Sequence, residues 1–235
     1  MITRSRASYV SALDPSCPVK SEEPPIVVMT TAHESALRLQ ERVSCPVVHV
    51  PEAIDIGLFR AEIPLHQRQI HLLELGRRWD AWHEAVLPTT RSGGLRHVFE
   101  PSKGHLVFSN REALVDGLSQ SAISVCFPSN LTHPERSGSI ETLTQRYLES
   151  MASGCLIVGH APKELVDILG YNPLIESDPD DAADIVSHIL KNLTDYQALV
   201  DKNRNSMVQI CDNRHRAERI MEIVRTARPA RERRT

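Results

Sequence analysis

Short apolar runs alternate with amphipathic segments of about ten residues through most of this chain. The apolar runs lie at 26–29, 46–51, 69–75, 122–127 and 155–158. The helical patterns between them lie at 34–43, 79–87, 111–120, 142–152 and 162–169. A strand followed by a helix returns to its sheet through a right-handed crossover, which places the next strand parallel to the first. The alternation therefore predicts an α/β fold with a mostly parallel sheet and helices on both faces.

Shorter patterns complete the expected order of elements. We expect brief strands at 97–99, 106–108 and 174–176, and helices at 181–190, 195–211 and 215–224. Gly154 is expected to end the helix at 142–152, because glycine favours the left-handed conformation found at helix C-termini. Residues 1–24, rich in Ser, Pro and charge, predict a flexible leader. The basic tail at 226–235 is either an interaction arm or a frayed terminus.

Charge and composition exclude several classes of protein. The formal charge of −3, from 27 Lys and Arg against 30 Asp and Glu, argues against nucleic acid as a partner. No apolar run approaches the roughly 18 residues that cross a bilayer, and no signal peptide precedes the first strand. The five cysteines form no CxxC pair, which indicates free thiols and a cytoplasmic location.

One loop-to-helix turn carries an unusual set of polar residues. A loop of small residues that includes Gly138 leads into the helix expected at 142–152, whose first N–H groups would lack partners and could bind an anion. Glu141 precedes this helix and Glu149 lies two turns inside it. Carboxylates accept paired hydrogen bonds from vicinal hydroxyls, so the two residues suit a sugar ring and a ribose.

The spacing Glu-x7-Glu and the following Ser-Met-Ala-Ser-Gly-Cys-Leu-Ile-Val at 150–158 resemble the signature of family-4-like glycosyltransferases of the GT-B fold. The resemblance implies the Rossmann-like C-terminal domain of such an enzyme. It also implies a nucleotide diphosphate sugar as donor, no cofactor, no metal, and retention of the anomeric configuration. By position, Glu141 would contact the donor sugar, Glu149 the ribose, and the backbone N–H groups of Leu143 and Thr144 the diphosphate.

The sequence departs from the family pattern at three positions. Thr142 and Thr144 stand where the family has glycine, and Leu156 stands where it has proline. A β-branched residue narrows the room for a phosphate, although a threonine hydroxyl can donate a hydrogen bond in compensation. The alternative interpretation is structural: Glu141 would be a solvated acid at a helix start, and Glu149 a surface charge.

Two further turns are candidates for the same crevice. Gly76-Arg77-Arg78 resembles the family's Gly-Arg turn, whose arginine neutralises the leaving diphosphate; Arg77 fits by position, with Arg78 as the alternative. The family's lysine is missing after this turn. His160 lies in a turn that either lines the crevice or simply begins a helix. Dinucleotide-binding, P-loop and Gly-x-Ser-x-Gly motifs are absent from the sequence, and no histidine pair at helical spacing predicts a metal site.

The resemblance also suggests a division of the chain. Residues 25–45 would be a strand–helix remnant of an N-terminal acceptor domain, and 46–225 the nucleotide-sugar-binding domain, entered through an interdomain crossing at 46–59. Two complete domains need roughly 300 residues, so we expect most of the acceptor domain to be missing. The chain would then be a glycosyltransferase acting on an unknown acceptor, or its donor-binding half.

The missing domain leaves other interpretations open. The chain could be a non-catalytic nucleotide-sugar-binding module, or an unrelated α/β interaction domain, so enzymatic activity stays undecided. A homo-oligomer or a partner chain would complete the cleft. Ile54, Ile56, Leu58 and Phe59 are candidates for the exposed interface, unless they pack back onto the donor domain.

Overall fold

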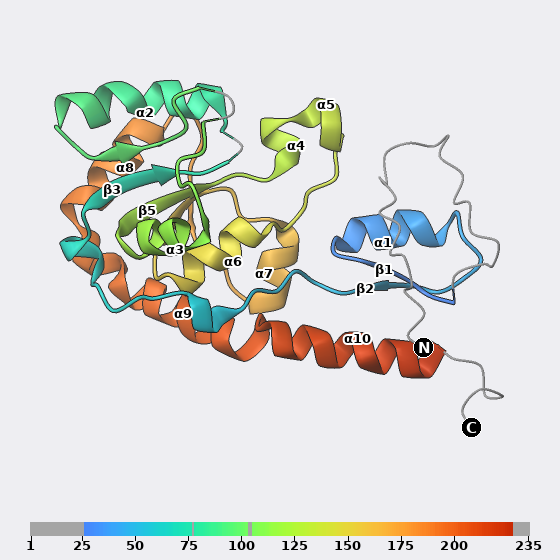
Figure 1. Ribbon diagram of the computed structural model, residues 1–235. Coiled ribbons are helices and arrows are strands. Elements are labelled where there is room, and N and C mark those ends of the chain that lie inside the picture. The colour runs from blue at the N-terminus through green and yellow to red at the C-terminus, as the bar shows by residue number, and fades with distance from the viewer. Residues whose placement is uncertain (1–25, 77, 103–104, 228–235) are drawn as a thin grey trace.

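The strands of the protein form two parallel sheets. The computed structural model describes residues 26–76, 78–102 and 105–227. Within them β1 (Val28–Thr30) pairs with β2 (Val47–His49), and a five-stranded sheet has the order β4-β3-β5-β6-β7 (Figure 1). Its strands are β3 (Ile70–Glu74), β4 (His97–Val98), β5 (Ser121–Cys126), β6 (Leu156–Gly159) and β7 (Ile175–Glu176). Every pairing is parallel, which confirms the α/β fold expected from the sequence.

Helices follow most of the strands, as the alternation predicts. In chain order the α-helices are α1 (His33–Gln40), α2 (Asp80–Ser92), α3 (Arg111–Ser119), α4 (Ser129–Thr132), α5 (Pro134–Ser137), α6 (Gln145–Ala152), α7 (Lys163–Leu169), α8 (Ala182–Lys191), α9 (Gln197–Ile210) and α10 (Asn213–Ala227). Short 3₁₀ helices lie at Ile56–Leu58, Leu65–Gln67 and Leu193–Tyr196. No helix in these described ranges is long and apolar enough to cross a membrane.

The large sheet is covered by helices on both faces, so its central strands are buried throughout. Ile123 and Val125 of β5 pack with Trp82 of α2 and Val186 of α8. On the other face, Ile157 of β6 belongs to a cluster with side chains of α3, α6 and α9. All six residues of β5 are buried, which explains why this strand reads as a continuous apolar or small-residue run.

Two glycines fix the geometry around β6. Gly154 has a φ of 67° and follows the C-terminal end of α6, as expected from the sequence. Gly159 has a φ of 146°, and a Cβ atom there would lie 2.0 Å from the carbonyl oxygen of Cys126. The ends of β5 and β6 can approach this closely only because residue 159 has no side chain.

Three details differ from the sequence prediction. The strand expected at 106–108 is wrong: this segment is bent, Leu106 is 78% exposed, and Phe108 packs against Gly117 instead. The helix expected to begin at Thr142 begins at Gln145, so residues 142–144 form a loop before it. The loop expected to run through Gly138 contains the short helices α4 and α5.

Of the two alternatives open for residues 54–59, the structure shows packing onto the main body. Ile54, Ile56 and Phe59 are 4%, 8% and 4% exposed, because they pack into the cluster beneath the large sheet; Leu58 alone of the four is 41% exposed. Of the two termini, residues 1–25 and 228–235 lie outside the described residues, so the leader and most of the basic tail are not placed.

The small sheet and α1 form a unit beside the main body (Figure 1). The chain leaves β2 along residues 50–55, where Ile54 forms a parallel bridge with Asp212. Glu52 lies 3.2 Å from Arg216 of α10, and His49 lies 2.7 Å from Glu164 of α7. These contacts hold the small unit near the carboxyl ends of the large sheet's strands.

Candidate functional site

The strand order places a cavity where the chain changes direction across the sheet. From β3 the chain moves outward to β4, whereas from β5 it moves the other way through β6 to β7. Such a switch point opens a crevice outside the carboxyl ends of the two central strands. A cavity of about 500 Å³ lies there, lined by Thr31, Glu52, Leu75, Gly76, Val125, Cys126, Phe127, Thr142, Leu143, Thr144, Gln145, Arg146, Tyr147 and Glu149.

The loop before α6 presents backbone donors to this cavity. Thr142, Leu143 and Thr144 line it, and Thr144 is the N-cap residue of α6 with an extended conformation (φ −112°, ψ 156°). The Thr144 side chain makes no capping hydrogen bond. Helix-start N–H groups lack intrahelical acceptors and carry partial positive charge. The arrangement is compatible with the anion site predicted from the sequence, which stays a prediction.

Glu149 lies in the same cavity, one turn deeper. Its carboxylate is 2.8 Å from the guanidinium of Arg146, and the two side chains are 14% and 28% exposed. Burial raises the pKa of Glu149 above its ordinary value, although the nearby Arg146 and Arg111 act in the opposite direction. The alternative of Glu149 as a solvated surface charge is excluded by this burial.

Arg146 is a residue that the motif comparison did not single out. Its Nη1 atom is buried and makes no aligned hydrogen bond within the described part of the chain, although it lies 2.8 Å from Glu149. The Glu149 carboxylate is the charge partner of this guanidinium, and a guanidinium has five N–H donors, so Arg146 can pair with Glu149 and still donate to a ligand in the cavity. The i, i+3 spacing of the two residues in the sequence could have indicated this ion pair.

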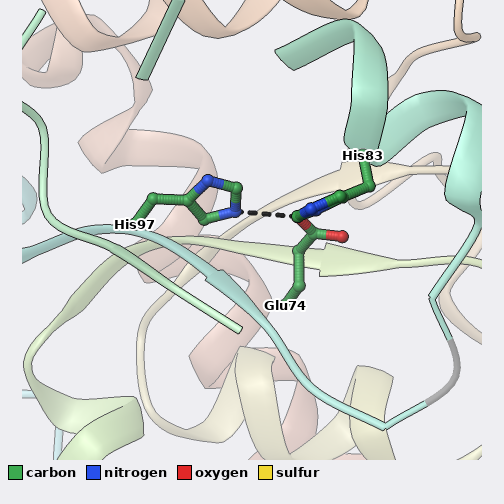
Figure 2. Close-up of side chains that lie close together, drawn as sticks. All are labelled: Glu74, His83 and His97. Carbon is green, nitrogen blue, oxygen red and sulfur yellow. Dashed lines mark hydrogen bonds and ion pairs between the residues drawn. The ribbon is translucent and has the colours of Figure 1, made fainter. Parts of the chain in front are cut away.

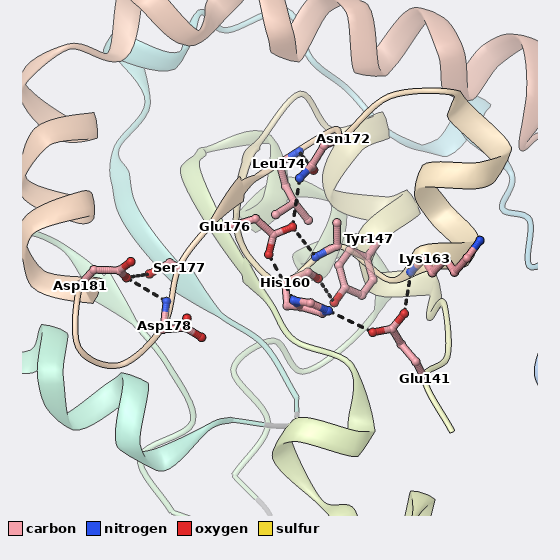
Figure 3. Close-up of polar contacts among 11 residues, drawn as sticks. Glu141, Tyr147, His160, Lys163, Asn172, Leu174, Glu176, Ser177, Asp178 and Asp181 are labelled. Atoms are coloured by element: carbon pink, nitrogen blue, oxygen red, sulfur yellow. Dashed lines mark hydrogen bonds and ion pairs between the residues drawn. The ribbon is translucent and has the colours of Figure 1, made fainter. Parts of the chain in front are cut away.

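Glu141 and His160 lie apart from Glu149. Glu141 accepts hydrogen bonds from His160 Nε2 at 3.0 Å and from the backbone N–H of Lys163 at 2.5 Å, so its carboxylate holds the first turn of α7 (Figure 3). The other ring nitrogen of His160 lies 3.2 Å from Glu176. Glu141 does not line the cavity around Glu149, so the structure does not bring the two motif carboxylates together.

The other site residues predicted from the sequence are Arg77, Arg78 and Gly138. Arg78 lines a second cavity of about 500 Å³, which shares Gly76 with the first, and its Nε donates to Asp80 at 2.8 Å. Arg77 lies outside the described residues. Gly138 ends α5 with a φ of 56° and lines neither cavity. Glu74, His83 and His97, which lie beside the second cavity, have the donor types of a metal site.

Comparison with known proteins gives similarity in structure alone. No protein-family model and no curated protein matches the sequence. Sucrose-phosphate synthase from Thermosynechococcus elongatus is similar with a TM-score of 0.57, at 15% identity, over 85% of this chain and 58% of that one. AviGT4, a glycosyltransferase of avilamycin A biosynthesis, is similar with a TM-score of 0.56, at 17% identity, over 86% and 66%.

HepE of Anabaena, solved with UDP and glucose, is similar with a TM-score of 0.59, at 10% identity, over 85% of this chain and 63% of that one. The α/β fold of this chain is similar to part of the fold of these proteins. At these identities the likeness shows the fold alone. The chain spans about three fifths of the length of these glycosyltransferases (58%, 66% and 63%).

Proposed function

We propose that the chain binds a nucleotide diphosphate sugar in the cavity at the start of α6 and takes part in glycosyl transfer to an acceptor that is not identified. One observation carries the proposal: a single cavity is lined by the loop before α6 together with Arg146 and Glu149. A helix start and a guanidinium are groups that bind an anion. The fold of HepE, which was solved with UDP and glucose, supports a nucleoside diphosphate as that anion.

Each residue has a proposed role in holding the donor. The diphosphate would accept hydrogen bonds from the backbone N–H groups of Leu143 and Thr144 and from Arg146. Glu149 would then exchange its ion pair for hydrogen bonds from the ribose hydroxyls. A cavity of about 500 Å³ accommodates a ligand of nucleotide size.

The transfer step would depend on charge stabilisation. The helix start and Arg146 would stabilise the negative charge that develops on the departing diphosphate. The sequence resemblance assigns the same role to Arg77. Glu141, to which the sequence resemblance assigns the donor sugar, lies outside this cavity and has no part in the proposal. Following the resemblance in sequence, we propose that transfer needs no metal and retains the anomeric configuration.

A second candidate function is binding of the donor without transfer. The chain covers about three fifths of its structural neighbours, so their whole activity does not follow for it. The chain would then be a nucleotide-sugar-binding subunit. The two functions share the same donor cavity and differ in turnover.

Calorimetry on the full chain with UDP, GDP and ADP tests the shared part. We expect saturable binding of at least one diphosphate, and weaker binding of the matching nucleoside. The exposed Arg136, whose side chain is 73% exposed, provides the control Arg136→Gln, which should bind like the wild type. Absence of binding at millimolar concentration contradicts the proposal. Release of sugar from UDP-glucose or GDP-mannose by the isolated chain then distinguishes the enzyme from the binding subunit.

A further inference from the structure

Three side chains that are distant in sequence meet beside the second cavity. Glu74 ends β3, His83 lies in α2 and His97 begins β4; all three point toward one another (Figure 2). Glu74 Oε1 lies 2.7 Å from His83 Nδ1 and 2.7 Å from His97 Nε2. Their side chains are 5%, 7% and 4% exposed. A carboxylate and two imidazoles are therefore gathered out of water at one point.

We propose that Glu74, His83 and His97 bind one divalent transition-metal ion, with Zn²⁺ as the representative. This inference goes beyond the donor-binding function. Two imidazole nitrogens and one carboxylate oxygen are a ligand set that zinc uses when its fourth position is open. The three donor atoms all lie within 4.8 Å of one another. Each comes from a different element of the fold, so the packing of β3, α2 and β4 fixes their arrangement.

The surroundings support the two histidines as ligands. His97 Nδ1 lies 3.1 Å from the hydroxyl of Thr90, a contact that orients the ring and directs Nε2 at Glu74. Metal-bound histidines are commonly held by such a second contact. The ring of Phe99 packs 4.6 Å from that of His83 and 4.8 Å from that of His97. The His97 ring is therefore held by the Thr90 hydroxyl, and both rings pack against Phe99.

An ion can reach the cluster and fit within it. Glu74 and Phe99 both line the second cavity, which gives a route from solvent and leaves a coordination position for water or a ligand oxygen. Ligand atoms about 2.1 Å from a tetrahedral zinc ion are roughly 3.4 Å apart. Glu74 Oε1 now lies 2.7 Å from each nitrogen, so each of these two separations must lengthen by about 0.7 Å when an ion enters.

The test is metal binding by the full chain after treatment with a chelator and dialysis. Zn²⁺ affinity is measured by competition with a chromophoric chelator, and Co²⁺ provides absorption bands that report coordination geometry. We expect one ion per chain and the intense bands of a four-coordinate site. Glu74→Gln and His97→Gln should each weaken Zn²⁺ binding at least a hundredfold. Thr90→Val, which leaves all three ligands in place, should weaken it about tenfold.

His49→Gln is the matched control, because it removes another histidine that lies 2.7 Å from a glutamate, in this case Glu164, and should leave Zn²⁺ binding unchanged. Should the ligand variants fail to fold, the stoichiometry and Co²⁺ spectrum of the wild type still decide. The proposal is overturned if the wild type binds neither Zn²⁺ nor Co²⁺. It is also overturned if Thr90→Val and every ligand variant that folds bind the ion as tightly as the wild type. The cluster would then be a hydrogen-bonded charge network only.

Discussion

Glu149 gives the sharpest test of how the cavity holds a nucleotide. Its carboxylate is 14% exposed and faces Arg146 at 2.8 Å. If the carboxylate accepts ribose hydroxyls, Glu149→Ala removes hydrogen bonds to a charged group, which contribute about 1.5–3 kcal/mol. At about 1.4 kcal/mol for each tenfold change, the expected loss is about 10- to 150-fold in affinity. Glu149→Gln keeps the shape and one acceptor oxygen, so we expect a smaller loss.

Comparing ligands separates a ribose contact from an effect through Arg146. A lost ribose contact weakens uridine and UDP by the same factor, if UDP is the nucleotide that binds. A displaced Arg146 weakens UDP alone, because uridine has no phosphate. Isothermal titration calorimetry with both ligands, on wild type and both variants, measures the two factors. Equal affinities of wild type and Glu149→Ala for both ligands would refute the role that we assign to Glu149.

The stability of these variants has an expected sign. Burial raises the folded-state pKa of Glu149 above 4.5, so ionising it costs more in the folded protein than in the unfolded chain. Its contribution to stability is therefore present below pH 4.5 and lost as the pH rises through the raised pKa. Glu149→Gln removes this dependence. We expect its melting temperature at pH 7 to equal or exceed that of the wild type, although its nucleotide affinity is lower.

Three further expectations rest on other residues. Arg146→Gln should weaken UDP about tenfold or more and leave uridine unaffected in calorimetry, whereas equal loss for both ligands would contradict a phosphate contact. Gly159→Ala should destabilise the fold by about 3 kcal/mol or more in urea titrations, because its Cβ would lie 2.0 Å from a carbonyl oxygen. Gly57→Ala is the control, because the nearest atom to its Cβ lies at 3.4 Å. Equal urea midpoints for the two variants would show that the backbone at Gly159 relaxes. Burial raises the pKa of Cys126 to about 12 and those of Cys155 and Cys211 to about 11. These thiols should therefore react slowly with a thiol reagent at pH 8 until urea is added, and the free energy of unfolding should fall above pH 9, where only the unfolded chain ionises. Rapid labelling of these three thiols in the native protein would contradict their burial.

The positions of the buried strands along the chain could be predicted because each has a strong local pattern. The strands β5 and β6 are buried on both faces, and their sequences are correspondingly apolar or small. Gly154 marks the end of α6 because few other residues adopt its left-handed conformation. In such places the local sequence and the tertiary environment favour the same structure.

Other features depend on contacts that no local pattern reports. Leu106 and Phe108 look like strand residues, but Phe108 packs against Gly117 of α3, and this contact bends the segment away from the sheet. The start of α6 at Gln145 agrees with the β-branched side chains of Thr142 and Thr144, which are less favourable in a helix. A pattern of apolar residues cannot distinguish these outcomes.

The candidate site likewise has some features that a local sequence pattern predicts and others that depend on tertiary contacts. The motif placed Glu149 and the loop before α6, which do line one cavity. Glu141 instead holds α7, because His160 and the N–H of Lys163 are better partners within reach. His83 and His97 approach Glu74 only after β3, α2 and β4 have packed, so their spacing in sequence carried no metal signal.

The parallel pairing of the large sheet has a consequence for how the protein reaches its native state. Adjacent strands in this sheet are joined by long crossovers and never by a hairpin: Ile70 pairs with Ser121, and Ile123 pairs with Leu156. Closing such loops costs chain entropy before any strand contact forms, so folding through these contacts is slow. During synthesis β3 lacks one of its two neighbours until β5 has left the ribosome. Until then β3 has an unpaired edge that can associate with other chains. Misfolding is therefore most favoured during the synthesis of the residues between β3 and β5.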